Sequence, residues 1–348
     1  MIRENLAGDG IDPRELQELN LRPLWTEAVS AVTKEAPGQP LRHAIPTVWR
    51  YRVVREQLLR AGGHVTVEQA ERRVLVLVNP GHKTPGGISA DSAIFVGAQL
   101  VLPSETTTCH RHSAGAARLL VEGSRASTIV NGERLPMEPG DVILTPPHHW
   151  HEHVHEGSEP VIWLDILDIP ISGNIDAIYF ERGVRTSPND VKIESRRYRV
   201  PGVVPYRSPL AAPGRYPLLH YRWLDVHDAL TGLAACVDRA EPLHLMYVNP
   251  ETGSSALEPY CFSVRMLRPG EELALTLTSA SAVFHVIDGE GESQIGDLTV
   301  SWEPKDVMAA PSQLAVRHRN RSTTRAAFLL QVDNSPLQHK LGWYREFS

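Results

Sequence analysis

Two stretches of the chain share one layout of apolar runs and turns, and this internal repeat constrains the fold more than any other feature. Residues 263–320 repeat the layout of residues 97–153. The alignment pairs Gly123 with Gly289, 166 positions later, and Asp141 with Asp306, 165 positions later. Self-similarity on this scale indicates two copies of one structural unit. The sequence therefore predicts two β-barrel units.

Apolar residues change their spacing near Arg73. From there on they form short, β-branched runs separated by Gly, Pro and Asn turns, as in a sandwich or barrel. The Asn-Gly-Glu sequence at 131–133 predicts a hairpin. Residues 13–70 carry helical spacing instead, with a Pro at the start and Gly62-Gly63 closing the last apolar stripe. We predict a mainly β chain with an N-terminal helical segment.

Five parts follow from these patterns. They are an N-terminal helical segment (1–72), an N-terminal barrel (73–170), a connector (171–240), a C-terminal barrel (241–335) and a tail (336–348). The connector is rich in Pro, Tyr and Arg and only weakly periodic. We expect it to wrap the two barrels rather than to form a domain of its own.

Three histidines stand at a spacing that suits a metal ion. His110 and His112 would lie on one face of a strand, because side chains alternate with period two. His151 follows a Gly-Asp turn and a Thr-Pro-Pro corner and can close the site from a neighbouring strand. Three neutral imidazoles leave a divalent metal with open positions for a substrate and a co-reactant. The alternative is a surface pair of histidines, which leaves the spacing of His151 unexplained.

The second copy of the repeat serves as an internal control. His110 aligns with Thr276, His112 with Thr278 and His151 with Val316. The second copy therefore lacks all three candidate ligands, and we predict one metal site, in the N-terminal barrel. His153 aligns with His318, so that position does not follow the metal.

Composition excludes several classes of protein. The net charge of −6 offers no basic face for nucleic acid, and no apolar run approaches the ~20 residues that cross a membrane. The N-terminus lacks the apolar core of a signal peptide. Three cysteines without a C-x-x-C motif favour a reducing compartment. We predict a cytoplasmic protein that binds neither nucleic acid nor membranes.

The motifs around the histidines resemble those of a known family. They are HRH (110–112), RLLVEG (118–123), NGERLPMEPGDVILTPPHHWHEH (131–153) and WLDILDIP (163–170). They resemble the bicupin ring-cleaving dioxygenases, which comprise gentisate 1,2-dioxygenase and its salicylate and 1-hydroxy-2-naphthoate relatives, over roughly residues 15–335. The resemblance implies a double cupin, that is, two β-barrel jelly-roll domains, with Fe(II) in the N-terminal one. It also implies a homotetramer that uses O2 to open an aromatic acid between its carboxyl- and hydroxyl-bearing carbons.

Departures from the family pattern bear on the substrate. The stretch SAGAAR (113–118) carries no carboxylate, whereas a general cupin has a Glu ligand there. The gentisate branch also lacks this Glu, so its absence supports the three-histidine assignment. SAGAARLL also differs from the gentisate motif, and His148-His149 stand where aromatic and small polar residues are usual. The resemblance therefore implies either gentisate or a 5-substituted salicylate, such as 5-nitrosalicylate, as substrate.

Four further residues are candidates for catalysis or substrate binding. Arg118 lies an even interval after His110 and can bind a carboxylate or phenolate, although a surface ion pair remains open. His153 can exchange a proton with oxygen, or can be a solvent-facing strand end. Asp165 can orient a His or Arg, or be structural. The resemblance brings Arg73, or its neighbour Arg72, to the substrate.

Two other functions remain open for the same site. Cupins support several metals and chemistries, so an isomerase or decarboxylase using Mn, Zn or Ni is one alternative. A non-catalytic bicupin with a vestigial site is the other.

Overall fold

The computed structural model describes residues 18–21, 43–70, 72–82, 87–183, 198 and 216–347. The chain divides into two compact units, Met1–Arg42 and His43–Ser348. In the first unit only the short stretch 18–21 is described, so most of the helical spacing predicted before residue 43 lies outside the described residues.

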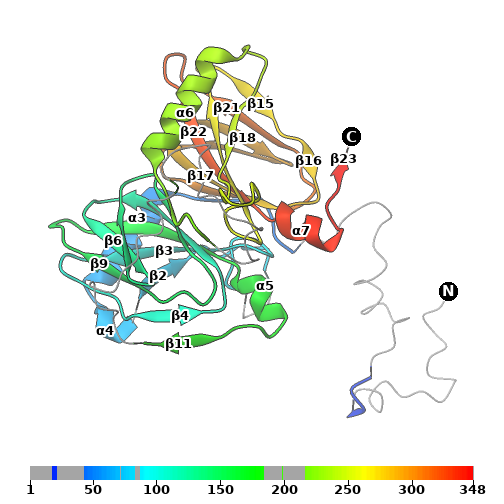
Figure 1. Ribbon diagram of the computed structural model, residues 1–348. Helices are drawn as coiled ribbons and strands as arrows, with labels where there is room; N and C mark the ends of the chain where they lie inside the picture. Colours follow the sequence, from blue (N-terminus) through cyan, green and yellow to red (C-terminus); the bar gives the residue numbers. More distant parts are fainter. Residues whose placement is uncertain are drawn as a thin grey trace. The chain divides into compact units, whose positions relative to one another are not determined.

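The first jelly roll consists of two antiparallel sheets. One has the order β12 (His220–Tyr221), β8 (Val142–Thr145), β5 (Ala116–Glu122), β10 (Val161–Leu167), β3 (Phe95–Val101) and β2 (Arg73–Val76). The other has the order β11 (Phe180–Arg182), β4 (His110–His112), β9 (His151–His155), β6 (Ala126–Val130) and β7 (Glu133–Met137). The cyan and green strands of Figure 1 belong to this jelly roll.

The second jelly roll has the same plan. One sheet has the order β1 (Thr47–Trp49), β20 (Val307–Ala310), β17 (Ala282–Asp288), β22 (Ala327–Asp333), β14 (Cys261–Leu267) and β13 (Leu243–Met246). The other has the order β15 (Glu272–Ala274), β21 (Val316–Asn320), β18 (Gly291–Ile295) and β19 (Leu298–Trp302). Near them β16 (Leu277–Thr278) pairs with β23 (Glu346–Phe347).

The repeat seen in the sequence is a repeat of topology. Strands β8, β5, β10 and β3 occupy the same places in the first jelly roll as β20, β17, β22 and β14 in the second. The predicted pair of mainly β jelly-roll domains is confirmed, and each domain consists of two sheets that do not close into a continuous barrel. The hairpin is confirmed: Asn131 and Gly132, which connect β6 and β7, have φ values of 46° and 84°. Positive φ at both central residues is the geometry of a type I′ turn.

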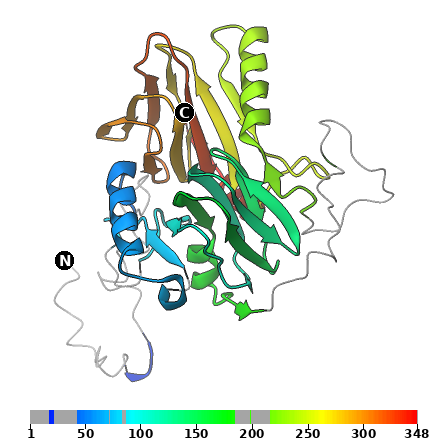
Figure 2. The ribbon, with the colours of Figure 1, turned by 90° about the vertical axis from the view of Figure 1, so that its left-hand side faces the viewer.

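The two jelly rolls exchange an edge strand. β1 precedes the first jelly roll in sequence but pairs with β20 of the second, while its helix α3 (Tyr51–Gly62) packs on β2 and β3 of the first (Figure 2). β12 precedes the second jelly roll but pairs with β8 of the first, while its helix α6 (Trp223–Cys236) packs on β13 of the second. Each strand–helix unit therefore spans both jelly rolls.

This exchange corrects two expectations from the sequence. Residues 47–49, within the segment with helical spacing, form a strand, because their backbone pairs with the open edge of β20. The predicted connector contains β12 and α6, a helix of 14 residues, and not only irregular chain. The weak periodicity of α6 in the sequence fits its environment, since Leu230 is the helix residue that is fully buried.

A hydrophobic core runs through both jelly rolls. Leu119 and Trp163 of the first belong to the same buried cluster as Val264 and Leu330 of the second. Trp163 is fully buried and is among the largest side chains in that cluster. Burial of this much apolar surface across the junction stabilises the two jelly rolls as one body.

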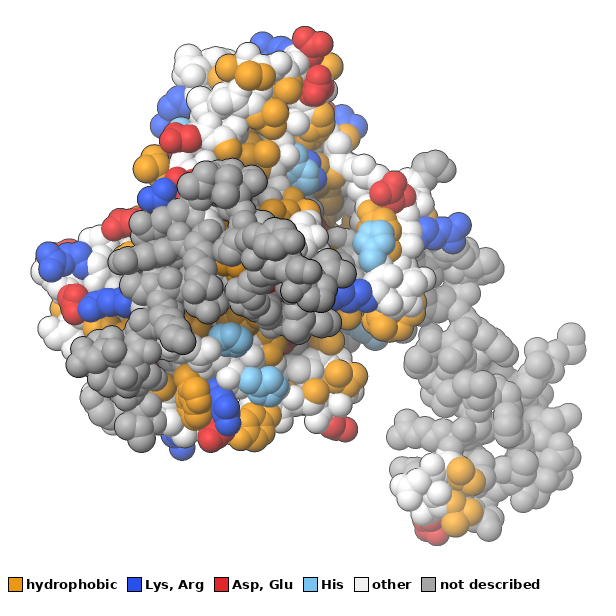
Figure 3. Space-filling view, viewed as in Figure 1, with side chains coloured by type: hydrophobic (Ala, Val, Ile, Leu, Met, Phe, Trp, Pro, Cys, Tyr) orange, Lys and Arg blue, Asp and Glu red, His pale blue; other side chains and the backbone are white. Residues whose placement is uncertain are grey.

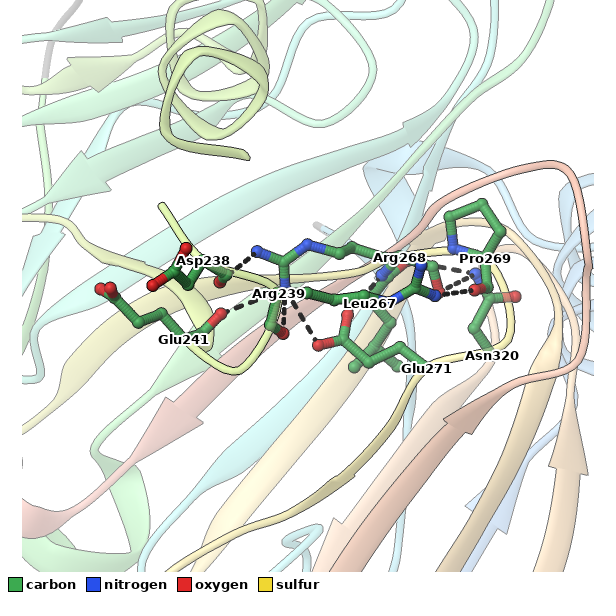
Figure 4. A network of polar contacts seen from close by, with 8 residues as sticks. All are labelled: Asp238, Arg239, Glu241, Leu267, Arg268, Pro269, Glu271 and Asn320. Atoms are coloured by element: carbon green, nitrogen blue, oxygen red, sulfur yellow. Dashed lines mark hydrogen bonds and ion pairs between the residues drawn. The ribbon is translucent and has the colours of Figure 1, made fainter. Parts of the chain in front are cut away.

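The turn after α6 is fastened to the end of β14 by Arg268 (Figure 4). Its guanidinium donates hydrogen bonds to the backbone carbonyls of Asp238, Arg239 and Glu241 and pairs with Glu271 at 3.1 Å. Three carbonyls and one carboxylate thus accept from the planar set of N–H donors of the guanidinium. The network holds the connector to the second jelly roll.

The remaining described helices are short: α4 (Val67–Ala70), α5 (Ile169–Asn174) and α7 (Ser335–Leu341). None of the helices in the described ranges has the length and apolar character needed to cross a lipid bilayer. Charged side chains of both signs are interspersed with hydrophobic ones on the face shown in Figure 3.

Candidate metal centre

The three predicted ligands come together inside the first jelly roll. His110 and His151 face each other across the pairing of β4 with β9, and His112 lies on the same face of β4. Their ring centroids are 4.2 Å apart for His110 and His151, 4.8 Å for His112 and His151, and 5.6 Å for His110 and His112. The three candidate ligand atoms all lie within 4.8 Å of one another, and all three residues are buried.

Backbone carbonyls fix the orientation of each ring. The Nδ1 atoms lie 2.7 Å from Thr108 O for His110, 2.7 Å from Ala114 O for His112 and 2.9 Å from His149 O for His151. A carbonyl can only accept, so each Nδ1 carries the proton and each Nε2 presents its lone pair. All three Nε2 atoms are buried and have no hydrogen-bond partner. Three orphaned lone pairs that converge on one point fit a bound divalent metal.

Electrostatics keep the three rings neutral. Burial lowers the pKa of His110 to about 3 and that of His112 to about 4, and it holds the pKa of His151 well below 6.5. The positive charge of Arg118 lowers all three pKa values further, and that of Arg72 lowers the pKa values of His110 and His112. Neutral imidazole is the form that binds a metal, so the site needs no proton release near neutral pH.

Arg118 is buried inside the first jelly roll, not on the surface. Its Nε lies 2.9 Å from Asp165 Oδ1 across the pairing of β5 with β10, and its Nη1 donates to Thr145 Oγ1 at 2.7 Å. Trp163 Nε1 donates to the other oxygen of Asp165 at 3.2 Å. Burial lowers the pKa of Arg118 and raises that of Asp165, while each partner's charge opposes that effect. The surface ion pair considered from the sequence is excluded by this burial.

His153 is also buried and does not face solvent. Its Nδ1 lies 3.0 Å from Thr128 Oγ1, whose hydroxyl donates to the Sδ of Met137 at 3.3 Å. Its ring centroid lies 6.0 Å from that of His151 and 5.1 Å from Trp163. His153 Nε2 has no partner among the described residues, so its second nitrogen is open to the interior beside the three histidines.

The second jelly roll lacks this polar network as well as the ligands. The strand equivalence places Phe284 at the position of Arg118, Gln331 at that of Asp165 and Ala310 at that of Thr145. The cross-strand pair Arg118–Asp165 becomes Phe284–Gln331 in the same register. His153 and Thr128, in contrast, become His318 and Ser293, which remain hydrogen-bonded at 2.7 Å. The ion pair is therefore present only where the three histidines are.

The two neighbouring arginines have different surroundings. Arg73 is buried on the opposite face of the sheet, where it pairs with Glu105 and donates to Val65 O. Arg72 lies with its guanidinium carbon 5.9 Å from the centroid of Phe180, and Phe180 stacks on His110 at 5.4 Å. The structure thus brings Arg72, and not Arg73, to the three histidines.

Sequence reasoning missed Phe180 and Gln99. Phe180 lies on β11, in a stretch without periodicity, and no local signal marks it. Gln99 is a buried amide on β3, opposite Trp163, whose side-chain nitrogen and oxygen both lack partners. A single polar residue inside the apolar run AIFVGAQLV was the available signal.

Comparisons with known proteins agree with this geometry. A cupin domain family model matches residues 98–167. The chain is 42% identical to a gentisate 1,2-dioxygenase of Ralstonia over 97% of this chain and 94% of that protein. It is 32% identical to a 5-aminosalicylate 1,2-dioxygenase of Comamonas, over 95% and 88% of the two chains. The crystal structure of a salicylate 1,2-dioxygenase from Pseudaminobacter salicylatoxidans matches with a TM-score of 0.87 at 29% identity, covering 96% of each chain.

Two jelly rolls define a bicupin, and among the described residues the candidate metal ligands lie in the first cupin. The likeness to the Ralstonia protein extends over nearly the whole of both chains. The chain belongs to the gentisate 1,2-dioxygenase family. It is a ring-cleaving dioxygenase, an oxidoreductase.

Proposed function

We propose that the chain binds one Fe(II) through His110, His112 and His151 and uses O2 to open a hydroxylated aromatic acid between its carboxyl- and hydroxyl-bearing carbons. The observation that carries the proposal is the convergence of three unpartnered Nε2 atoms inside the first jelly roll. Bound Fe(II) supplies orientation and electron transfer between the ring and dioxygen. Three neutral ligands leave its charge intact and coordination positions open.

Arg118 is proposed to bind an anionic oxygen of the substrate. Asp165 and Thr145 hold two of its nitrogens, and its Nη2 has no hydrogen bond among the described residues. A guanidinium fixed in this way offers a donor at a defined place without losing side-chain entropy on binding. Asp165 acts as a positioning residue for Arg118, because Trp163 and Arg118 occupy its two oxygens.

Arg72 is proposed as the second cation of the substrate site, in place of Arg73. After burial, its charge is the largest influence on the pKa of His110, so it lies close enough to act on that ring. Phe180 contacts both Arg72 and His110, Arg182 also lies 5.9 Å from its ring centroid, and the residue is 42% exposed. An aromatic carboxylate can stack on such a ring while an arginine binds its carboxylate.

His153 is proposed to accept a proton at Nε2 and to return it later in the reaction. The Thr128 hydroxyl donates to Met137, so its oxygen is free to accept the Nδ1 proton of His153, which leaves the Nε2 lone pair unprotonated. Thr128 therefore sets the tautomer, and Nε2 is the atom that faces the reacting groups.

Gentisate is the first candidate substrate and a 5-substituted salicylate the second. The likeness to the Ralstonia gentisate enzyme supports the former. The likeness to the Comamonas 5-aminosalicylate enzyme, and to a Bradyrhizobium 5-nitrosalicylic acid 1,2-dioxygenase over 32% of this chain, supports the latter. The test is oxygen uptake with gentisate, salicylate, its 5-amino, 5-nitro and 5-chloro derivatives, and 1-hydroxy-2-naphthoate. A gentisate preference above about a hundredfold in kcat/KM, a gap of roughly 2.7 kcal/mol, rules out the salicylates.

Failure of every acid to consume oxygen would overturn the proposed reaction. Metal analysis of the same preparation then separates an isomerase or decarboxylase, which would carry another metal, from a bicupin without a functional site.

The homotetramer and the cytoplasmic location remain predictions. Exposed Ile175, Ile178 and Tyr179 beside Phe180 support self-association, since a contiguous apolar stretch favours an interface. Light scattering during gel filtration measures the number of subunits.

A further inference from the structure

The second jelly roll contains a cavity at the place where the first holds its three histidines. Its volume is about 230 Å³. Thr276, Thr278 and Val316, which align with the three histidines, all line it. Replacing three imidazoles with two hydroxyl side chains and a valine opens space that no metal ligand fills. A cavity of this size accommodates a molecule built on a single ring.

A buried arginine lies in the wall of this cavity. Arg265 occupies on β14 the position that Gln99 occupies on β3, so the second jelly roll carries an interior cation on a different strand from Arg118. Burial lowers the pKa of Arg265 to about 10, while the negative charge of Asp333 opposes this effect, so the side chain is charged near neutral pH. Its Nε donates to Gln331 Oε1 at 3.1 Å. Among the described residues, neither Nη1 nor Nη2 of Arg265 has a hydrogen bond or an ion pair.

Two acidic side chains also line the cavity, and both are engaged by neighbours. Asp333 accepts hydrogen bonds from the backbone N–H and hydroxyl of Ser335, and from Gln331 Nε2 at 2.8 Å. Gln331 therefore lies between Arg265 and Asp333, with its oxygen toward the cation and its nitrogen toward the anion. Glu346 lies on β23, which pairs with β16, and accepts from Tyr344 at 3.1 Å.

The rest of the lining is mixed. Phe284, Leu275, Leu314 and Val316 are apolar, whereas Thr276, Thr278, Ser335 and Tyr344 bring hydroxyl groups. Sites for small organic molecules combine apolar surface with a few placed polar groups. Here the arrangement is a phenyl ring, one cation without a direct ion-pair partner, and two carboxylates. Hydrogen bonds from Ser335 and Gln331 hold Asp333, and Glu346 would repel a second negative charge on the ligand.

We propose that the cavity of the second jelly roll is a binding site for a small aromatic monocarboxylate, whose carboxylate pairs with Arg265 and whose ring packs on Phe284. The site is separate from the metal centre, because its lining residues all belong to the second jelly roll and the chain after it. It does not depend on the proposed substrate, since it rests on the charge and shape of this cavity alone. Dicarboxylates bind more weakly, because the second carboxylate meets Glu346.

The test is a fluorine NMR titration of the iron-loaded protein, without oxygen, with 4-fluorobenzoate as the probe. Arg265→Gln removes the charge, and Thr276→Trp fills the cavity from an exposed position. Both variants should weaken binding at one site at least tenfold. The matched controls Arg317→Gln and Thr299→Trp change exposed residues outside the cavity lining and should bind as the wild type does.

A second arm locates the site. His110→Ala should lose any binding at the metal centre and retain the component that Arg265→Gln weakens. The proposal is overturned if His110→Ala abolishes all binding of the probe, or if both cavity variants bind as the wild type does. It is also overturned if 4-fluorophthalate binds as tightly as 4-fluorobenzoate. Turnover of gentisate or a salicylate is measured for Arg265→Gln as a separate assay. That assay reports on the proposed function at the metal centre and not on binding in this cavity.

Discussion

Asp306 accepts a hydrogen bond at 2.8 Å from the backbone N–H of Tyr51, 255 positions earlier in the chain. Asp141 does the same for the backbone N–H of Trp223, also at 2.8 Å. Tyr51 and Trp223 are the first residues of α3 and α6. Each aspartate therefore caps a helix from within one jelly roll. The short strand before that helix, β1 or β12, completes a sheet of the same jelly roll. A carboxylate at a helix N-terminus satisfies an orphan donor and interacts favourably with the helix dipole.

Removing either aspartate should destabilise the whole second unit. Asp306 also accepts from Arg50 at 2.7 Å, so Asp306→Ala leaves a buried backbone donor without its acceptor and removes the ion-pair partner of Arg50. We expect the free energy of unfolding in urea to fall by about 3 kcal/mol, as for the loss of a charge-assisted hydrogen bond. Asp297→Ala, at an exposed position, is the control and should change it by less than about 0.5 kcal/mol. Equal effects in both variants would contradict the structural role of Asp306.

Loss of one histidine ligand should remove the metal. We expect His110→Ala to retain little iron and no measurable turnover, because two imidazoles provide too few ligands to hold a divalent ion. Metal analysis by mass spectrometry should give about one iron per wild-type chain. Thr276 and Thr278 offer no ligand nitrogen, so removing both hydroxyls should leave the iron content unchanged. Iron retained by His110→Ala at the wild-type level would place the metal elsewhere.

Arg118→Ala should impair turnover while the iron stays bound. A lost charge-assisted hydrogen bond costs on the order of 1.5–3 kcal/mol, which is roughly tenfold to more than a hundredfold in kcat/KM. Asp165→Asn should give a smaller loss, because the arginine remains but is less firmly positioned. If both variants lost iron together with activity, their role would be structural and not in substrate binding.

Arg72 and Arg73 can be separated by one pair of variants. Arg72→Ala should raise KM for the aromatic acid, because its guanidinium lies beside Phe180, which stacks on His110. Arg73→Ala should lower the melting temperature instead, since it leaves Glu105 without its buried partner. The opposite outcome would return Arg73 to the substrate site.

Acid should destabilise the second jelly roll through its buried histidines. Burial lowers the pKa of His285 and of His318 from 6.5 to about 3. The unfolded chain therefore binds more protons between these pH values, and the free energy of unfolding must fall as pH drops from 6.5 toward 3. His285→Leu should make this fall less steep. Urea unfolding at pH 7.5, 6 and 5 measures the slope, and an unchanged slope in the variant would rule out His285 as a contributor.

The repeat, the strands and the three histidines follow from the sequence because their signals are local. Period-two spacing places His110 and His112 on one face whatever the rest of the chain does. The asymmetric loss of ligands in the second copy is visible in the alignment alone. These features account for the jelly rolls and for the histidine cluster at the proposed metal centre.

Other features depend on contacts that no local pattern encodes. β1 and β12 are edge strands of three and two residues, too short for a periodic signal, and each pairs with a strand far away in sequence. Arg72 and Arg73 are neighbours with opposite environments, so an uncertainty of one residue reverses the assignment. Phe180 reaches His110 only because β11 pairs with β4.

The exchange of β1 and β12 means that the unit of sequence repetition is not the unit that folds. A cut near residue 240 would leave an N-terminal fragment that keeps both β1 and β12, and a C-terminal fragment whose β20 has lost the strand beside it. An unpaired, apolar sheet edge of this kind invites pairing with another chain. The C-terminal fragment should consequently be insoluble or unstable when made alone, and it should recover its fold when made together with the N-terminal fragment, which supplies β1.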